Sequence, residues 1–404
     1  MADARSVRGG EGLSLVLMLF YLMSTLTLAL MAVVTVELQE RFGLTASEVG
    51  LLTSVFMFAY GAVGIPAGVM AARWGGRVLV LSCAFFVVGS LLFGLGSSYA
   101  AFLTGRVLQG LGGGMTLPVS SAVMARYLAP QASTRGWGLF ASGKGLGALV
   151  ALLLMPGIAV LGGFRAIYLT TAGMALVVGA VALSQKPVRA LPERASTVLT
   201  SPRDLGRMLG EVAANRNVLL LGLFNAASLA VGTGVLIWTP DFLAAQHASN
   251  ADVAAYLTAG LAVAQLLGAP AGAAVAMRRG RMPVIVGSMV AMTVATAVVP
   301  LVPGRAAVFV MVMLVGFFSL AYFSPRFAMI ADVVARPEQV GPAAGLINLL
   351  GFGVSTLAPW LFGLALDRGL GYRAGYLVLA AFGAAGAAGA ALFRPGERSP
   401  RLGR

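Results

Sequence analysis

The chain has 404 residues, of which 59% are hydrophobic and only 10% are charged. A soluble protein usually carries about 25% charged residues, so this composition excludes a soluble fold. A single cysteine, Cys83, and a single histidine, His247, exclude disulfide frameworks, zinc sites and catalytic Cys/His or Ser/His pairs. We expect no metal, no cofactor and no enzymatic activity. The net charge of +14 would suggest nucleic acid in a soluble protein, but here the basic residues lie between apolar segments, and we expect no nucleic-acid partner.

Twelve apolar stretches of about 20 residues are each long enough to cross a bilayer as a helix. The first stretch is too long for a cleaved signal peptide and is followed by eleven more, so we expect it to remain attached. The predicted fold is an all-α integral membrane protein with twelve transmembrane helices. The predicted spans are 13–36, 51–71, 79–97, 101–128, 137–160, 167–184, 218–238, 253–276, 283–302, 306–334, 342–364 and 375–393.

The basic residues predict the orientation of these spans. With the N-terminus inside, 20 of the 28 lysines and arginines fall in cytoplasmic segments and only 5 in outer loops. The positive-inside rule then places the N-terminal tail 1–12 and the C-terminal tail 394–404 in the cytoplasm. The excess of arginine over lysine is typical of a GC-rich bacterial genome, so we expect a multi-pass protein of the bacterial cytoplasmic membrane.

The longest polar stretch separates six spans from six. Residues 185–217 mix arginine, glutamate, proline and serine, which predicts a cytoplasmic linker between the halves 13–184 and 218–393. We favour a solvated connector here over the alternative, an amphipathic surface helix around Pro202–Ala214.

The two halves repeat one another. Shifting the chain by about 204 to 208 residues aligns Gly64–Gly68 with Gly268–Gly272, and Gly163–Leu169 with Gly371–Leu377. Glu37 aligns in the same way with Asp241. These matches are typical of a duplicated transporter half, so we predict two six-helix halves of equal topology.

On these features the chain resembles the major facilitator superfamily, over about residues 13–393. The loop motif of that family between its second and third helices is matched by Gly68, Arg73, Gly75 and Arg77, with Ala72 in place of the acidic residue. The resemblance implies that Arg73 and Arg77 help to control the transport cycle, without the usual carboxylate. The arginine pattern of the fourth family helix is matched by Arg106 and Gly110.

The fifth helix of proton-driven drug antiporters of that family carries a Gly-Pro-x-x-Gly-Gly motif. The corresponding residues here, Ala151–Pro156, lack it, although the second half keeps a proline at Pro359. This departure argues against drug efflux.

Three basic residues lie within predicted spans, and no mid-membrane carboxylate matches them. Lys144 and Arg326 are the deepest, and a cation in hydrocarbon costs about 2.5–3.5 kcal/mol on insertion scales, so each should face the interior or a counter-charge. An anionic substrate would supply that charge, and a guanidinium binds carboxylates bidentately. For Lys144 the alternatives are snorkelling to the headgroups or a structural ion pair, and for Arg326 a structural tie to another helix.

Other polar residues follow the inner faces of the predicted helices. Arg106 begins a stripe with Gln109, and it either contacts substrate or packs and gates the helices. Amides and phenols at helical spacing are further candidates for substrate contact, although interhelical hydrogen bonds explain them equally well. These candidates are Tyr21, Asn225, Tyr322 and Asn348.

The acidic residues lie at the ends of the predicted spans. Glu37 and Asp241 fall at outer ends, where they are candidates for gating or proton coupling, and solvation is the alternative. Asp332 lies near the inner end of span 306–334 and is a gating candidate that can pair with Arg336 at i+4.

Three functions remain open at this point. The favoured one is alternating-access transport, secondary active or facilitative, of a small organic anion by a monomer with Lys144 and Arg326 facing a central cavity, with protons as a candidate coupling ion. The second is proton-coupled efflux of drugs or amphiphilic compounds, which the 18 methionines and the aromatic residues around Tyr322 favour. The third, a receptor or assembly factor without transport, has no positive support.

Overall fold

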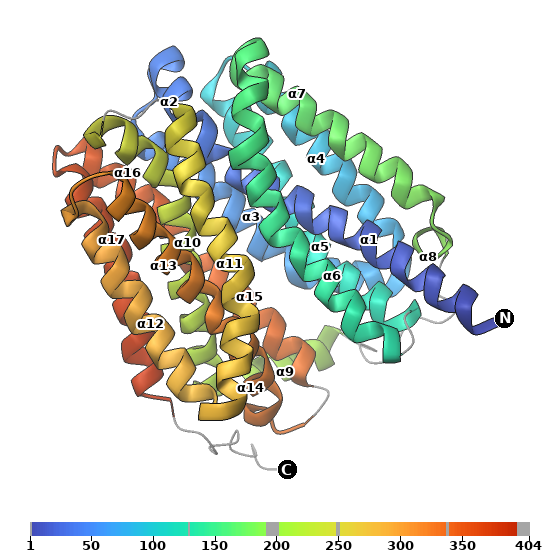
Figure 1. Cartoon of the computed structure of the whole chain (residues 1–404). Helices are drawn as coiled ribbons and strands as arrows, with labels where there is room; N and C mark the ends of the chain where they lie inside the picture. The colour runs from blue at the N-terminus through green and yellow to red at the C-terminus, as the bar shows by residue number, and fades with distance from the viewer. Residues whose placement is uncertain (1, 128–129, 191–201, 248–250, 337–338, 394–404) are drawn as a thin grey trace. The chain divides into compact units, whose positions relative to one another are not determined.

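The computed structural model describes residues 2–127, 130–190, 202–247, 251–336 and 339–393 (Figure 1). Regular structure in these ranges is entirely helical. The chain forms two compact units, the first from Met1–Leu44 and Val55–Ala195, the second from Thr45–Ser54 and Ser196–Arg404.

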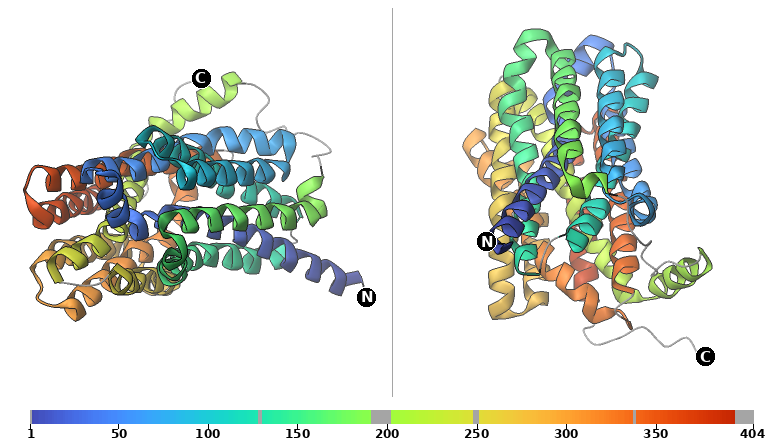
Figure 2. Two further views of the ribbon diagram at one scale, coloured as in Figure 1. Left: turned by 90° about the horizontal axis from the view of Figure 1, so that it is seen from above. Right: turned by 90° about the vertical axis from the view of Figure 1, so that its right-hand side faces the viewer.

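The first unit contains the helices of the N-terminal half. They are α1 (Ala2–Ala29), α2 (Met31–Phe42), α3 (Ala46–Trp74), α4 (Arg77–Leu95), α5 (Tyr99–Tyr127), α6 (Pro130–Leu149), the π-helix η1 (Val150–Leu154), α7 (Met155–Ser184) and α8 (Lys186–Arg189). Within this unit α1 packs along α6 and α4 along α5 (Figure 2). Helix α3 begins in the second unit and continues into the first.

The second unit contains the remaining helices. They are α9 (Pro202–Ala213), α10 (Arg216–His247), α11 (Ala251–Arg279), α12 (Arg281–Val298), the 3-10 turn η3 (Val299–Leu301), α13 (Arg305–Ala321), α14 (Phe323–Val333), α15 (Val340–Ser355), α16 (Leu357–Asp367) and α17 (Gly371–Ala391). Helix α10 is the most enclosed of the candidate membrane spans in the described chain. It forms the core of this unit and packs against α15 and α17.

Ten helical segments of the described chain are long and apolar enough to cross a membrane. One of them, Ser142–Ser184, has 43 residues, about 65 Å of helix against a hydrocarbon core of about 30 Å. It is kinked at Gly162 and Gly163, where the backbone leaves the helical region, so it supplies two crossings. Helix α5, which carries the buried Arg106, supplies the twelfth.

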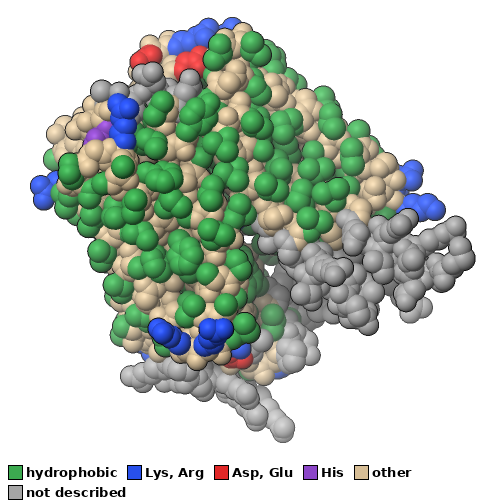
Figure 3. Space-filling model, viewed as in Figure 1, with side chains coloured by type: hydrophobic (Ala, Val, Ile, Leu, Met, Phe, Trp, Pro, Cys, Tyr) green, Lys and Arg blue, Asp and Glu red, His purple; other side chains and the backbone are tan. Residues whose placement is uncertain are grey.

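The outer surface is apolar. Large hydrophobic side chains such as Leu161, 83% exposed, and Val294, 57% exposed, point away from the helices. The face seen in Figure 3 carries hydrophobic side chains along the helix flanks, with lysines and arginines near the helix ends. Such a surface requires lipid as its solvent, because it would aggregate in water.

Two predicted spans are broken by proline. Pro325 has no N–H to bond the carbonyl of Ala321, and Pro359 has none for the carbonyl of Ser355, since each proline lies four residues further on. Helix α13 accordingly ends at Ala321, and α15 ends at Ser355. The sequence predicted these two spans as continuous helices.

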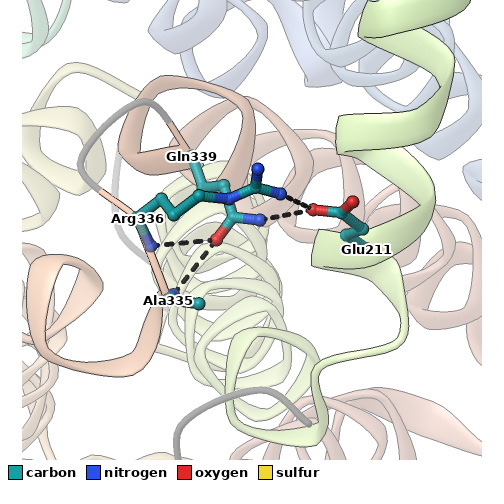
Figure 4. A network of polar contacts seen from close by, with 4 residues as sticks. All are labelled: Glu211, Ala335, Arg336 and Gln339. Carbon is teal, nitrogen blue, oxygen red and sulfur yellow. Dashed lines mark hydrogen bonds and ion pairs between the residues drawn. The ribbon is translucent and has the colours of Figure 1, made fainter. Parts of the chain in front are cut away.

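The linker contains more regular structure than the sequence interpretation favoured. A solvated connector is wrong for Pro202–Ala213, which forms α9. Glu211 of α9 accepts hydrogen bonds from Arg336 and from Gln339 Nε2, the latter at 2.8 Å, while Gln339 Oε1 accepts the backbone N–H groups of Ala335 and Arg336 (Figure 4). These bonds attach α9 to the segment between α14 and α15.

Candidate functional site

Arg326 lies buried in the first turns of α14. The break after Ala321 lets α14 start at Phe323, and the Arg326 N–H donates to the Tyr322 carbonyl at 3.0 Å. The Arg326 side chain is 1% exposed, and its Cζ lies 4.5 Å from the ring centre of Phe327 and 5.5 Å from that of Phe323. Aromatic faces stabilise a cation by their quadrupole but do not neutralise its charge. This region therefore holds a positive charge in an apolar, aromatic setting.

Hydrogen bonds connect the helix break to two other helices. The hydroxyl of Tyr322, whose ring centre lies 5.7 Å from Arg326 Cζ, donates to Asn225 Oδ1 of α10 at 3.2 Å. Asn225 Nδ2 donates to the Ile347 carbonyl at 3.3 Å and to Asn348 Oδ1 at 3.5 Å, both on α15. The structure thus brings the predicted residues Tyr322, Asn225 and Asn348 together beside Arg326.

A second set of hydrogen bonds joins α10, α11 and α13. Ser228 Oγ of α10 donates to the Ser319 carbonyl at 2.6 Å, and Gln265 Nε2 of α11 donates to Ser319 Oγ at 3.2 Å. The sequence interpretation missed Gln265, although an amide in the middle of an apolar span is a signal that could have identified it.

The internal repeat explains why the two units differ here. By register Gly351 corresponds to Lys144, and Asn225 corresponds to Tyr21. A Cβ atom at Gly351 would lie within 2.7 Å of Asn225 Cγ, so Asn225 fills the space that a side chain at position 351 would need. The repeated position thus carries a cation in the first unit and a glycine in the second, where the Asn225 amide takes the space.

In the first unit Arg106 is fixed by its neighbours. Its side chain is fully buried, Nη1 donates to the Thr27 carbonyl at 2.7 Å and to Gln109 Oε1 at 2.9 Å, and Cζ lies 4.5 Å from the ring centre of Phe56. Gln109 Nε2 donates in turn to Ser90 Oγ at 3.1 Å. Arg106 and Gln109 therefore tie α5 to α1 and α4, which is the packing alternative for Arg106.

Lys144 lies on α6 where that helix contacts α1 closely. Its neighbours Gly143 and Gly147 face the backbone of Met18 and Leu22. The Lys144 side chain is partly exposed. One turn earlier Phe140 stacks on Tyr21 with ring centres 4.7 Å apart and planes 7° apart. The structure therefore places two predicted residues, Lys144 and Tyr21, at the same α1–α6 contact.

The two candidate coupling acids occupy repeat-related positions. Glu37 Oε2 accepts the Phe164 N–H at 2.7 Å, where α7 restarts after its kink. Asp241 Oδ2 accepts the hydroxyl of Tyr372 at 2.7 Å, and Tyr372 corresponds to Phe164 by register. Glu37 thus holds α2 to α7 just after its kink, and Asp241 holds α10 to the start of α17. Their role in coupling stays a prediction.

The residues near the predicted cytoplasmic side form local contacts within each unit. Arg73 is exposed, and Arg77 Nε donates to the Arg189 carbonyl of α8 at 2.9 Å. Asp332 forms an ion pair with Arg281, the counterpart of Arg77. The expected pairing of Asp332 with Arg336 is wrong.

The reason for this correction is the end of a helix. Helix α14 ends at Val333 with an extended Val334, so residue 336 does not follow the helical path that the i+4 expectation required. Arg336 pairs instead with Glu211 of α9.

Comparison with known proteins decides the family. The sequence model described as Major Facilitator Superfamily matches residues 13–269 and 226–403, nearly the whole chain. The chain belongs to the major facilitator superfamily. It is therefore a multi-pass membrane transport protein and not an enzyme, and the predicted twelve-helix fold is confirmed.

Three relatives within this superfamily carry different names. A probable 4-methylmuconolactone transporter of Cupriavidus pinatubonensis is 26% identical over 337 residues, 78% of this chain and 76% of the relative. Methylenomycin A resistance protein of Bacillus subtilis is 26% identical over 55% of this chain and 50% of its own length. Probable anion transporter 7 of Oryza sativa is 30% identical over 44% of this chain and 42% of its own length.

A solved structure has the same fold. The bacterial homolog to the human lysosomal transporter Spinster aligns with a TM-score of 0.77 at 18% identity, covering 95% of this chain and 96% of that chain. At this identity the likeness establishes the fold alone.

Proposed function

We propose that this facilitator carries a small organic anion, with Arg326 as the residue that binds its negative charge. The observation that carries the proposal is a guanidinium 1% exposed among aromatic rings within the apolar span Arg305–Ile330, because ionisable residues inside membrane-spanning segments mark substrate pathways. The fork of a guanidinium suits a planar carboxylate. The relative named as a probable anion transporter agrees with this class of solute.

Neighbouring side chains supply the polar contacts that an organic anion needs beyond its charge. Tyr322, Asn225 and Asn348 form a connected set of hydroxyl and amide groups. Lys144 is proposed separately as a further cation that the anion contacts during transport. Protons are the proposed coupling ion, with Glu37 and Asp241 as carriers at the rim, in a monomer of the bacterial cytoplasmic membrane with both termini inside.

Uptake into proteoliposomes tests this function. The panel contains labelled monocarboxylates, dicarboxylates, inorganic anions and a cationic dye. We expect Arg326→Ala to lower carboxylate uptake by at least about tenfold, since a hydrogen bond to a charged group contributes about 1.5–3 kcal/mol. Lys144→Ala should lower it as well. Uptake by Arg326→Lys should lie between that of the unchanged protein and that of Arg326→Ala, because lysine keeps the charge and loses the planar fork.

The matched control is Arg373→Gln, which removes a cation from an exposed position at the start of α17. Monodispersity in size-exclusion chromatography checks that each variant folds. Full carboxylate uptake by both Arg326→Ala and Lys144→Ala would remove the proposed site.

Efflux of an amphiphilic compound is the second candidate. A resistance protein among the relatives favours it, and so do the paired rings of Phe317 with Phe318 and of Phe323 with Phe327, whose centres lie 5.2 and 4.8 Å apart. Dye movement without movement of any anion in the same panel would establish this candidate and exclude the first.

A further inference from the structure

The beginning of α3 contacts the end of α16. Residues Thr45–Ser54 cluster with the second unit, although the rest of α3 belongs to the first. The contact joins residues more than 300 positions apart in the chain. By the predicted topology it lies on the outer side.

All four N–H groups at the start of α3 have acceptors. Thr45 N–H donates to Glu48 Oε2 at 2.8 Å, and Glu48 N–H donates to Thr45 Oγ1 at 3.2 Å, which forms a capping box inside α3. The other two come from Ala46 and Ser47, and they donate to the two carboxylate oxygens of Asp367 at 2.9 and 2.8 Å. Half of this helix cap therefore comes from the C-terminal end of α16.

Close backbone contacts extend the same interaction along α3. Ser54 Oγ donates to the Thr356 carbonyl. Gly50 faces Pro359, and a Cβ atom at Gly50 would lie within 2.8 Å of the Pro359 carbonyl carbon. Gly363 in turn leaves no room for a side chain beside Ala46. Two glycines thus let the helices approach closely enough for the Asp367 carboxylate to reach the end of α3.

We infer that Asp367 is a gating residue whose carboxylate holds the start of α3 against α16 and is released during each transport cycle. In alternating access the two halves rock against each other. Because α3 continues from one unit into the other, the halves rock only if α3 bends or the Asp367 bonds break. Asp367 is exposed, so water can replace its carboxylate on both N–H groups when the contact opens. This inference does not depend on which solute is carried.

Cysteine labelling without any solute tests the gating role. Thr53 is fully buried on the α3 face of Gly50, and within the described part of the chain its hydroxyl has no hydrogen-bond partner, so Thr53→Cys is a mild reporter. Cys83→Ser removes the only native cysteine. The rate of maleimide labelling is measured in lipid nanodiscs, where both faces of the protein are accessible.

We expect Asp367→Asn to raise the labelling rate by about fivefold, the effect of losing one helix cap. Ser54→Ala removes a separate bond of the same contact and should also raise it, which provides a second test if Asp367→Asn does not fold. Glu48→Gln is the matched control, because it removes the same charge from the same helix end, while a glutamine at this position still completes the capping box with Thr45. Unchanged rates in Asp367→Asn and Ser54→Ala, or an equal rise in Glu48→Gln, would overturn the gating role.

Discussion

Asn225 has a role that depends on one missing side chain. It bonds Tyr322 at the break between α13 and α14, and it bonds Asn348 on α15. Both contacts require the space at Gly351, where a Cβ atom would overlap the amide. Replacing one hydrogen of Gly351 by a methyl group would therefore affect three helices.

We expect Gly351→Ala to destabilise the protein by about 1–3 kcal/mol, the usual cost of overpacking a closely packed site. The thermal unfolding midpoint of the purified protein should fall, and uptake should fall with it because Asn225 is displaced. Gly353→Ala is the matched control two residues away, since a Cβ atom there meets nothing within 4 Å. Equal midpoints for the two variants would show that Asn225 does not depend on this space.

Single residues show how far the sequence could predict the site. The depth of Arg326 and its position beside Tyr322 follow from helical spacing, and both side chains are buried. The bonds of Asp367 to the start of α3 could not be predicted, because they join residues 320 and 321 positions apart. The partner of Asp332 was missed because α14 ends at Val333, which takes Arg336 off the helical path, and because the actual partner, Arg281, lies on α12.

At the scale of helices, the repeated pair of glycines in α3 and α11 packs differently in the two units. Gly268 and Gly272 on α11 face the backbone of Phe317 and Ala321 on α13. Their counterparts Gly64 and Gly68 on α3 face open space. In the first unit the helices that correspond to α11 and α13 are α3 and α5. The glycines at this contact lie on α5, where Gly110 and Gly114 face the α3 backbone. Close contact is thus kept, while the helix that supplies the glycine changes.

This difference predicts unequal effects of one substitution at repeat-related positions. Gly272→Ala should lower the thermal midpoint and transport, at a cost of about 1–3 kcal/mol, because its Cβ atom would overlap Ala321. Gly68→Ala should be neutral or slightly stabilising, since alanine favours a helix over glycine by about 1 kcal/mol. Equal losses in both variants, measured in the same detergent, would contradict the packing described.

Helix breaks mark the limit of sequence prediction at this scale. The number of spans followed from the length of the apolar stretches, and the twelve-helix fold is confirmed. The sequence also contained Pro325 and Pro359, but a proline within a span either bends a helix or ends it. Packing against neighbouring helices decides between these outcomes, and here α13 and α15 each end at the residue whose carbonyl the proline cannot bond, Ala321 and Ser355.

At the scale of the whole molecule, the distribution of arginine predicts the orientation in the membrane. We expect green fluorescent protein fused after Arg404 to fluoresce, and alkaline phosphatase fused there to be inactive, because the C-terminus is predicted to be cytoplasmic. Fusions within the predicted outer loop near Arg165 should give the opposite pattern. An active phosphatase after Arg404 would reverse the assignment of both sides, and with it the side on which Asp367 lies.

The shared helix α3 also bears on how this protein can be recombined with its relatives. The two repeated halves of the sequence meet at the linker, so a chimera joined there would appear to exchange complete halves. The folded second unit, however, includes Thr45–Ser54 from before that joint. A second half taken from a relative would pack against the α3 start of this chain, but it would lack Gly363, which faces Ala46, and Asp367, which accepts the first N–H groups of α3. Recombination of this chain with a relative therefore has to transfer residues 45–54 together with α16.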